Sequence, residues 1–278
     1  MTGLIIKNIS NDYTVISNNN IYICKPRGKF RNDKTSPLVG DIVDFDENNN
    51  YILNIHKRKN SLIRPSVANV DIAVIVTSVK NPNFDTHLLD KTLTIVSYNN
   101  ITPVIYFTKL DLLNNEELNN INNYINYYKK IGYPVATNIK ELNNITKNKI
   151  VVLTGQSGAG KSTLLNKIEP SLNLNTNEIS LALGRGKHTT RHTELYNIKG
   201  TYIVDTPGFS KIDFFEMENK DIRDNMKEMF ENLHLCKYKD CMHLTEDGCE
   251  VIKLVKENKI LESRYKNYKN FIERKQYD

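Results

Sequence analysis

Nine residues near the middle of the chain constrain its fold more than any other stretch. Residues 155–163 read Gly-Gln-Ser-Gly-Ala-Gly-Lys-Ser-Thr, between the apolar run Ile150–Leu153 and the helix-like pattern of residues 164–168. A strand, a glycine-rich turn and a helix in this order are typical of a phosphate-binding loop, whose backbone N–H groups surround phosphate oxygens at the positive end of the helix. The alternative is a glycine turn before an ordinary helix. The full pattern favours a site for a nucleoside triphosphate.

Each residue type in this loop has an expected role. Lys161 reaches the β- and γ-phosphates, and the Ser162 hydroxyl ligates Mg²⁺. We expect the rest of the loop to line the nucleotide as well: Gly155, Gln156, Ser157, Gly158, Ala159, Gly160 and Thr163.

A candidate base-reading motif lies upstream of the loop, after the apolar run Val104–Phe107. It reads Thr108, Lys109, Leu110, Asp111. The Asp111 carboxylate can accept hydrogen bonds from N1–H and N2–H₂ of guanine, a donor pair that adenine lacks, and Lys109 lies across the base. Thr108 stands where such motifs usually have Asn, so the strictness of guanine selection stays open.

The magnesium-associated motif Asp205-Thr206-Pro207-Gly208 lies downstream, after an apolar strand. Asp205 is expected to hold Mg²⁺ through water, and the Gly208 N–H to sense the γ-phosphate. Phe209 occupies the position where small GTPases often carry a water-orienting Gln, which predicts slow hydrolysis by the isolated protein. Along the chain, the base-reading motif comes first, followed by the phosphate loop, the switch segment and the magnesium motif. These are the motifs of a GTPase core, in an order that begins at a different point of the core.

The segment Gly184–Thr193 between these motifs is glycine-rich, basic and hydroxylated, as a switch loop should be. Either Thr189 or Thr190 is the expected Mg²⁺ ligand, and we assign Thr190. The alternative is a mobile basic loop without a catalytic role.

Residues 1–65 read as short strands, and residues 66–212 alternate strands and helices. Five β-rich runs are expected at Gly3–Ile9, Tyr13–Ser17, Ile21–Lys25, Asp41–Asp46 and Tyr51–His56, which fits a small OB-fold barrel. The loop Lys25–Arg31 is basic around one aromatic, Phe30, and suits a phosphate backbone with base stacking; a solvated hairpin is the alternative. The alternation that follows predicts a doubly wound α/β domain.

Residues 213–278 are expected to form a small helical domain with helices at Asp221–Leu233 and about Val251–Lys275. This segment contains a cluster of three cysteines and one histidine: Cys236, Cys241, His243 and Cys249. In a cytosolic chain this donor set predicts one structural Zn²⁺ rather than disulfides; free thiols are the alternative. The aromatics of the final helix are expected to pack on the zinc module, and its basic residues, Arg264 among them, either contact RNA or remain solvated.

Charge and hydropathy limit the remaining possibilities. Residues 1–65 carry 10 Lys and Arg against 6 Asp and Glu, and residues 252–278 carry 8 against 4, so the excess behind the net charge of +6 lies at the two ends. This distribution favours polyanion-binding appendages, or simply solvated surface charge. No apolar run approaches the roughly 20 residues of a membrane span, and the N-terminus lacks signal-peptide features. We expect a cytoplasmic, monomeric protein.

Nearly the whole chain resembles the circularly permuted, ribosome small-subunit-dependent GTPases of bacteria (RsgA/YjeQ type). The resemblance rests on Arg27–Arg31, Pro37–Asp41, Thr108–Asp111, Gly155–Thr163, Gly184–Thr190, Asp205–Gly208 and the Cys/His cluster. It implies an N-terminal OB-fold, a central circularly permuted P-loop GTPase domain and a C-terminal zinc-binding domain. It further implies binding to rRNA and the small (30S) ribosomal subunit late in maturation, with subunit-stimulated hydrolysis of GTP to GDP.

Two other hypotheses are open from the residues alone. One is an RNA-binding scaffold whose nucleotide site is structural, for which Lys161→Ala would leave ribosome binding intact. The other is an ATP-dependent kinase or transporter subunit, which is disfavoured because no ABC-type signature and no second substrate site is found.

Overall fold

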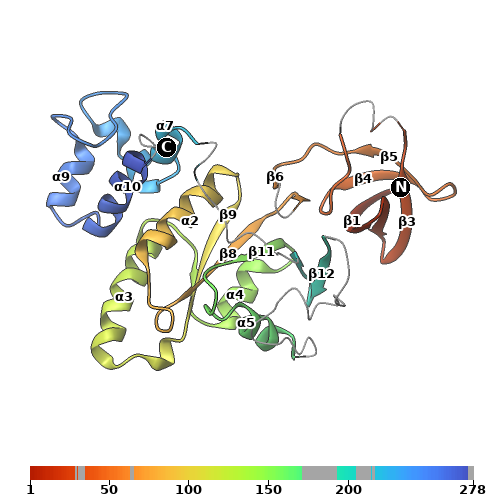
Figure 1. Ribbon diagram of the computed structural model, residues 1–278, viewed down its shortest axis with the longest axis horizontal. Helices are drawn as coiled ribbons and strands as arrows, with labels where there is room; N and C mark the ends of the chain where they lie inside the picture. Colours follow the sequence, from red (N-terminus) through yellow and green to blue (C-terminus); the bar gives the residue numbers. More distant parts are fainter. Residues whose placement is uncertain are drawn as a thin grey trace.

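A computed structural model describes residues 1–28, 30, 35–62, 66–170, 193–204, 214 and 217–274 of the 278-residue chain. Three parts follow one another along the sequence: an N-terminal barrel, a central sheet flanked by helices, and a small helical module at the C-terminus (Figure 1). No helix in the described ranges is long and apolar enough to cross a membrane.

Five antiparallel and parallel strands close the N-terminal barrel in the order β1-β2-β3-β5-β4, the OB-type arrangement that the sequence predicts. Their bounds are β1 Thr2–Ile9, β2 Asp12–Ser17, β3 Asn20–Pro26, β4 Ile42–Asp46 and β5 Tyr51–Ile55. The strands form because apolar residues alternate with polar ones, and the inward set, including Ile5, Val15 and Phe45, is fully buried. All five predicted strands are confirmed.

The barrel and the central sheet share one hydrophobic cluster. Ile5 and Val15 of the barrel belong to the same buried group as Ile101 and Ile150, which stand at the amino ends of two sheet strands. A short hairpin of β6 (Ser61–Leu62) and β7 (Val67–Ala68) joins the two parts. The Lys7 ammonium also pairs with Glu194 at 2.9 Å, where β1 touches the sheet.

The central sheet has six strands in the order β10-β9-β8-β11-β13-β12. The strands are β8 Ile72–Ser78, β9 Thr102–Thr108, β10 Val135–Ala136, β11 Ile150–Thr154, β12 Leu195–Ile198 and β13 Thr201–Val204. All neighbours are parallel except β12, which is antiparallel to β13. Parallel strands are buried on both faces, and β11 accordingly is buried throughout and apolar from Ile150 to Leu153.

Helices cover both faces of this sheet, which confirms the doubly wound prediction. One face packs against α2 (Thr86–Tyr98) and α3 (Asn115–Lys130), and the other against α4 (Ile139–Thr146) and α5 (Lys161–Ile168). Alternate residues of β8 divide between the faces: Ile75 meets the α2/α3 side, whereas Val74 and Val76 meet the α4/α5 side. A 3₁₀ turn, η1 (Leu110–Leu112), follows β9.

The C-terminal module contains shorter helices than the sequence predicts. They are α7 Asn219–Asp224, α8 Lys227–Glu231, the 3₁₀ turn η3 Leu233–Leu235, α9 Glu250–Lys256 and α10 Glu262–Arg274. The single helices predicted over Asp221–Leu233 and Val251–Lys275 are therefore wrong. In the second, Asn258 adopts a left-handed conformation (φ 56°), which ends α9 and lets the chain turn before α10 begins.

A buried ionic cluster joins this module to the central domain. Arg264 of α10 donates to Glu228 of α8 at 2.9 and 2.6 Å and to Asp90 of α2 at 2.7 Å, and none of the three side chains is more than 3% exposed. The hydroxyls of Tyr127 and Tyr128 on α3 donate to the same two carboxylates. The expectation that Arg264 contacts RNA or solvent is thus wrong, because its guanidinium neutralises two carboxylates in the domain interface.

The aromatic residues of α10 pack as predicted. Tyr268 and Phe271 are buried with Ile260 and the cysteines of the module, and the Tyr268 hydroxyl donates to the Met242 carbonyl at 2.6 Å.

Candidate functional site

The glycine-rich loop leaves β11 and enters α5 at the carboxyl edge of the sheet, as the sequence predicts. Gly155, Gly158 and Gly160 all have positive φ, which only glycine adopts readily. At Gly155 the approach of the neighbouring strand adds a second constraint, since a Cβ there would lie 2.2 Å from the Val76 carbonyl oxygen. Backbone N–H groups at the start of a helix can therefore surround an anion here.

Lys161 and Ser162 occupy the first turn of α5. The Lys161 ammonium donates to the carbonyl oxygens of Gly155 and Gln156, each at 2.7 Å, and burial lowers its pKa. Ser162 is buried at the base of the loop. The lysine thus lies folded over the loop, where a phosphate group would replace carbonyl oxygens as its partner.

The base-reading motif is tied directly to the phosphate loop. The Thr108 hydroxyl donates to the Ala159 carbonyl at 2.7 Å, and the Lys109 ammonium donates to the Gly158 carbonyl at 2.9 Å and to the Asn81 carbonyl. Lys109 adopts a left-handed conformation (φ 62°), which turns the chain into η1 and leaves the Asp111 side chain exposed. The base-reading motif and the phosphate loop, 49 and 51 positions apart at these two contacts, therefore form one continuous surface.

The Thr108–Ala159 contact could not be predicted from the sequence. Thr108 reads as a departure from the usual Asn, whereas in the fold its hydroxyl makes the link between the end of β9 and the phosphate loop. Only the strand order, which brings β9 and β11 to the two sides of β8, places the two residues together.

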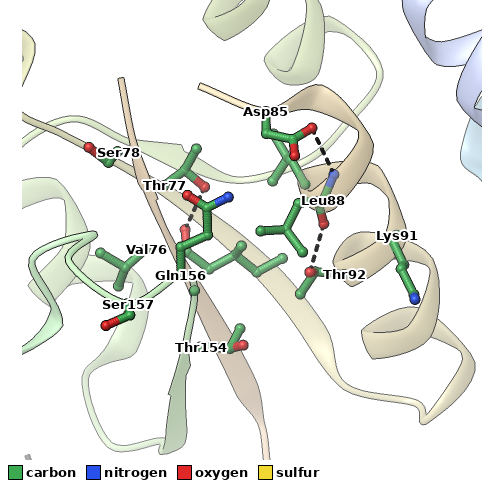
Figure 2. A pocket seen from close by; sticks show the side chains of 13 residues that line it. Val76, Thr77, Ser78, Asp85, Leu88, Lys91, Thr92, Thr154, Gln156 and Ser157 are labelled. Atoms are coloured by element: carbon green, nitrogen blue, oxygen red, sulfur yellow. Dashed lines mark hydrogen bonds between the residues drawn. The ribbon is translucent and has the colours of Figure 1, made fainter. Parts of the chain in front are cut away.

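A cavity of about 290 Å³ lies beside the start of the phosphate loop, between the ends of β8 and β11 and helix α2. Figure 2 shows Thr77, Gln156 and Ser157 on the sheet side, opposite Leu88 and Thr92 of α2. Thr108, Lys109 and Asp111 are not among the residues that line it. The cavity therefore adjoins the phosphate end of the site rather than the base end.

The remaining predicted nucleotide contacts lie outside the described residues. They are Thr190, with the alternative Thr189, in the segment Gly184–Thr193, and Asp205 and Gly208 after β13; Phe209, predicted to lack a water-orienting group, also lies outside the described residues. The strands that flank these segments, β12 and β13, are in place beside β11.

The structure gathers the four predicted metal ligands in the C-terminal module. One donor atom from each of Cys236, Cys241, His243 and Cys249 lies within 4.8 Å of the other three. His243 Nδ1 lies 3.3 Å from the Cys249 sulfur and 3.6 Å from that of Cys236, and the two sulfurs are 4.0 Å apart. A tetrahedral Zn²⁺ with Zn–S bonds of about 2.3 Å requires sulfurs about 3.7 Å apart, so the cluster fits this ion.

The hydrogen bonding and burial of these side chains favour metal binding. His243 Nε2 lies 3.1 Å from the Met229 carbonyl; a proton on Nε2 leaves Nδ1 free to face the sulfurs. Burial lowers the pKa of His243, which keeps the imidazole neutral. Burial, together with the adjacent Cys249, raises the pKa of Cys241 to about 12. A divalent cation would convert such thiols to thiolate ligands at neutral pH.

One predicted RNA contact is wrong. Phe30, expected to stack on a base, is 8% exposed and packs in the barrel core with Val39. The ring belongs to the hydrophobic cluster, so the loop offers the exposed cations Lys25 and Arg27 but no exposed ring. Lys29 and Arg31 lie outside the described residues.

The fold and the site together define a class of protein. A phosphate-binding loop follows a central parallel strand, and a Thr-Lys-Leu-Asp loop that contacts it comes earlier in the sequence. This arrangement is that of a P-loop GTPase with circularly permuted elements.

Comparison with known proteins gives the family. The sequence profile of the RsgA GTPase matches residues 55–215, and that of the RsgA N-terminal domain matches residues 2–52. The chain belongs to the RsgA GTPase family.

Relatives and solved structures match along nearly the whole chain. "Small ribosomal subunit biogenesis GTPase RsgA 2" of Oceanobacillus iheyensis is 46% identical, over 98% of this chain and 96% of its own length, and the RsgA of Enterococcus faecalis is 45% identical over 98% and 94%. The crystal structure of YloQ, described as a circularly permuted GTPase, has a TM-score of 0.84 and 34% identity, covering 100% of this chain and 96% of its own. YjeQ from Thermotoga maritima gives 0.85 and 33%, covering 98% and 97%.

Proposed function

We propose that this GTPase hydrolyses GTP to GDP and phosphate during late maturation of the small (30S) ribosomal subunit, in response to binding that subunit and its rRNA. The relatives named for small-subunit biogenesis support this assignment, since they match 98% of the chain. We further propose that the protein acts as a monomer in the cytoplasm, where the subunits are assembled.

The contact between the base-reading loop and the phosphate loop carries the nucleotide assignment. Thr108 and Lys109 bond to the carbonyls of Ala159 and Gly158, so a nucleotide with its phosphates in the loop would present its base to Asp111. The carboxylate would accept the paired N–H donors of guanine, and the Lys109 stem would cover the ring. Leu110 completes this loop in η1.

Lys161 would neutralise the β- and γ-phosphates, and the loop N–H groups from Gly155 to Thr163 would hold their oxygens. Ser162, Thr190 and Asp205 would hold Mg²⁺, which supplies charge neutralisation at the phosphates when bound. Ser162 fits this role because its buried hydroxyl stands in the first turn of α5, directly after Lys161. The Gly208 N–H would respond to the γ-phosphate. Phe209 has no group to orient water, so hydrolysis would be slow until the subunit binds.

The Cys/His cluster would hold one structural Zn²⁺ that stabilises the C-terminal module. The barrel would supply part of the rRNA contact through two exposed cations, Lys25 near the end of β3 and Arg27 just after it.

Turnover of GTP and of ATP by the purified protein, with and without small ribosomal subunits, tests this proposal. We expect slow GTP hydrolysis that the subunits raise strongly, and none with ATP. Lys161→Ala should abolish turnover, whereas Lys167→Ala, a change at an exposed lysine of the same helix, should not. Asp111→Asn should shift the preference towards xanthosine nucleotides. Turnover that subunits leave unchanged, with intact function of Lys161→Ala in cells, would instead support an RNA-binding scaffold.

A further inference from the structure

Most of strand β3 is paired with a neighbouring strand on one side only. Along its length β3 pairs with β2, from Ser17–Asn20 to Tyr13–Cys24. With β5, which closes the barrel, it pairs only through Lys25 and Pro26. Within the described residues, the stretch Asn20–Cys24 is therefore an open strand edge, and β3 lies on the side of the barrel away from the central sheet (Figure 1).

The backbone groups of Ile21 and Ile23 point to this edge. The β2–β3 hairpin turns through two residues with positive φ, Asn18 and Asn19, so its closing pair, Ser17–Asn20, is hydrogen-bonded. In β3 the backbone N–H and C=O groups of Asn20, Tyr22 and Cys24 then point towards β2, and those of Ile21 and Ile23 point away from it. The Lys25 N–H confirms this alternation, because it points away from β2 and donates to the Asn50 carbonyl at 2.8 Å.

The same two residues carry the most exposed large apolar side chains of the described residues. Ile21 is 65% exposed and Ile23 is 62% exposed, and Ile16 lies beside Ile21 on the same outer face. Proteins usually protect an open edge with charged residues, proline or a bulge. Residues 13–24 contain no charged side chain and no proline. An unprotected edge with β-branched side chains is suited to receiving another strand.

The chemistry of the edge favours a peptide over RNA. No cation stands along residues 13–24 to contact phosphates; Lys25, the next residue of β3, lies at the end that pairs with β5. The one ring on β3, Tyr22, packs on Phe45 with centroids 4.9 Å apart. The adjoining β4–β5 turn carries the carboxylates of Asp46 and Glu47. Hydrogen bonds from Asn49 lower the pKa of Asp46, so this carboxylate stays ionised and repels phosphate. Arg27, which also lowers the pKa of Asp46, follows β3 and lies outside the open stretch Asn20–Cys24.

We propose that an extended segment of a small-subunit protein adds to this edge as a further strand. Its backbone pairs with the N–H and C=O groups of Ile21 and Ile23, apolar side chains at alternate positions cover the two isoleucines, and a cationic residue lies towards Asp46 and Glu47. This inference rests on the proposed function, because it names the component of the subunit that the barrel contacts.

Two substitutions test the inference, one in the backbone donor and one in the apolar side chains. The measurement is the affinity of each variant for purified small subunits in the presence of a non-hydrolysable GTP analogue. Ile23→Pro removes an N–H that the barrel does not use, and we expect subunit affinity to fall about tenfold or more. Ile21→Lys keeps the backbone donor but adds a charge to the apolar row. It should weaken binding to a peptide, whereas an added cation would strengthen binding to RNA. Ile9→Lys, at an exposed isoleucine of β1 that is paired with Asp12, is the control and should change little.

Amide hydrogen exchange gives a readout that does not depend on any variant. The amides of Ile21 and Ile23 should exchange quickly in the free protein and slowly in the complex. Unchanged exchange at both amides, or tighter subunit binding by Ile21→Lys, overturns the inference. A concentration-dependent dimer that Ile23→Pro abolishes also overturns it, since the occupant would be a second copy of the chain. These outcomes are separate from failure of the proposed function, which would appear as absence of subunit-stimulated GTP turnover in the unaltered protein.

Discussion

The buried ionic cluster allows a quantitative prediction for Arg264→Met. In the folded protein the guanidinium makes three charge-assisted hydrogen bonds of 2.6–2.9 Å to Glu228 and Asp90, and its side chain is 0% exposed. Methionine fills much of the volume but leaves two buried carboxylates without a cation. Removal of one partner from a buried ion pair costs about 3–5 kcal/mol, a large fraction of the roughly 5–15 kcal/mol that stabilises a domain.

The loss should depend on pH. Burial alone would raise the pKa of Glu228, but Arg264 outweighs it and holds the pKa below its ordinary value of 4.5, so the pair stabilises the fold above that pH and loses this contribution as pH falls. In the variant the folded-state pKa of Glu228 rises above its unfolded value. The penalty is then absent at low pH and grows as pH rises through the new pKa. The difference in unfolding free energy between the two proteins should therefore be larger at pH 7 than at pH 5.

Urea unfolding measures this difference, followed by far-UV circular dichroism and tyrosine fluorescence, since the chain has 15 Tyr and no Trp. Lys253→Met, which breaks an exposed pair with Glu250, is the control and should cost less than about 1 kcal/mol. A triple variant that combines Arg264→Met with Asp90→Asn and Glu228→Gln should recover part of the loss. A loss below about 1 kcal/mol for Arg264→Met, or one that does not vary with pH, would refute a structural role for the cluster.

Contacts described above lead to two further predictions, and a third concerns the barrel, where the His56 ring lies 2.9 Å from the Asp44 carboxylate. Thr108→Val removes the hydroxyl that bonds to Ala159 and should weaken GTP binding about tenfold, whereas Thr108→Asn should retain most of the affinity; equal affinity for all three proteins in a titration would contradict the role of this contact. Cys241→Ser should lose bound zinc, measured by atomic absorption, and lower the melting temperature; unchanged metal content would remove the cluster as a zinc site. Hydrogen bonding, from the His56 ring above all, lowers the pKa of Asp44 to about 2, so its contribution to stability is present above pH 3.8 and lost as pH falls towards 2. Asp44→Asn should therefore flatten the acid limb of the stability profile between these values, and an unaltered limb would exclude the effect.

Features encoded in local sequence were predictable, because each depends on a short pattern. Alternating apolar residues gave the five barrel strands, and the glycine spacing gave the phosphate loop. The four candidate metal ligands were recognisable because all of them fall within residues 236–249, and the fold brings their donor atoms together.

Features that depend on distant partners were not predictable. Arg264 lies in a basic helix and reads as a surface residue, yet one of its partners, Asp90, is 174 positions away. Phe30 reads as an exposed ring among cations, and only closure of the barrel shows that it belongs to the core. Thr108 looks like a weakened motif until the strand order brings it to Ala159.

The hydrophobic cluster shared by the barrel and the sheet limits how the chain can be divided. Residues such as Ile5 and Val15 pack with Ile101 and Ile150, so the amino ends of the sheet strands are shielded from water by the barrel. Expression of the central part alone would uncover this apolar surface and favour aggregation over a working enzyme. Truncation at the end of the barrel is therefore a poor way to ask what the barrel contributes to GTP turnover, and point substitutions on its outer face are the appropriate tool.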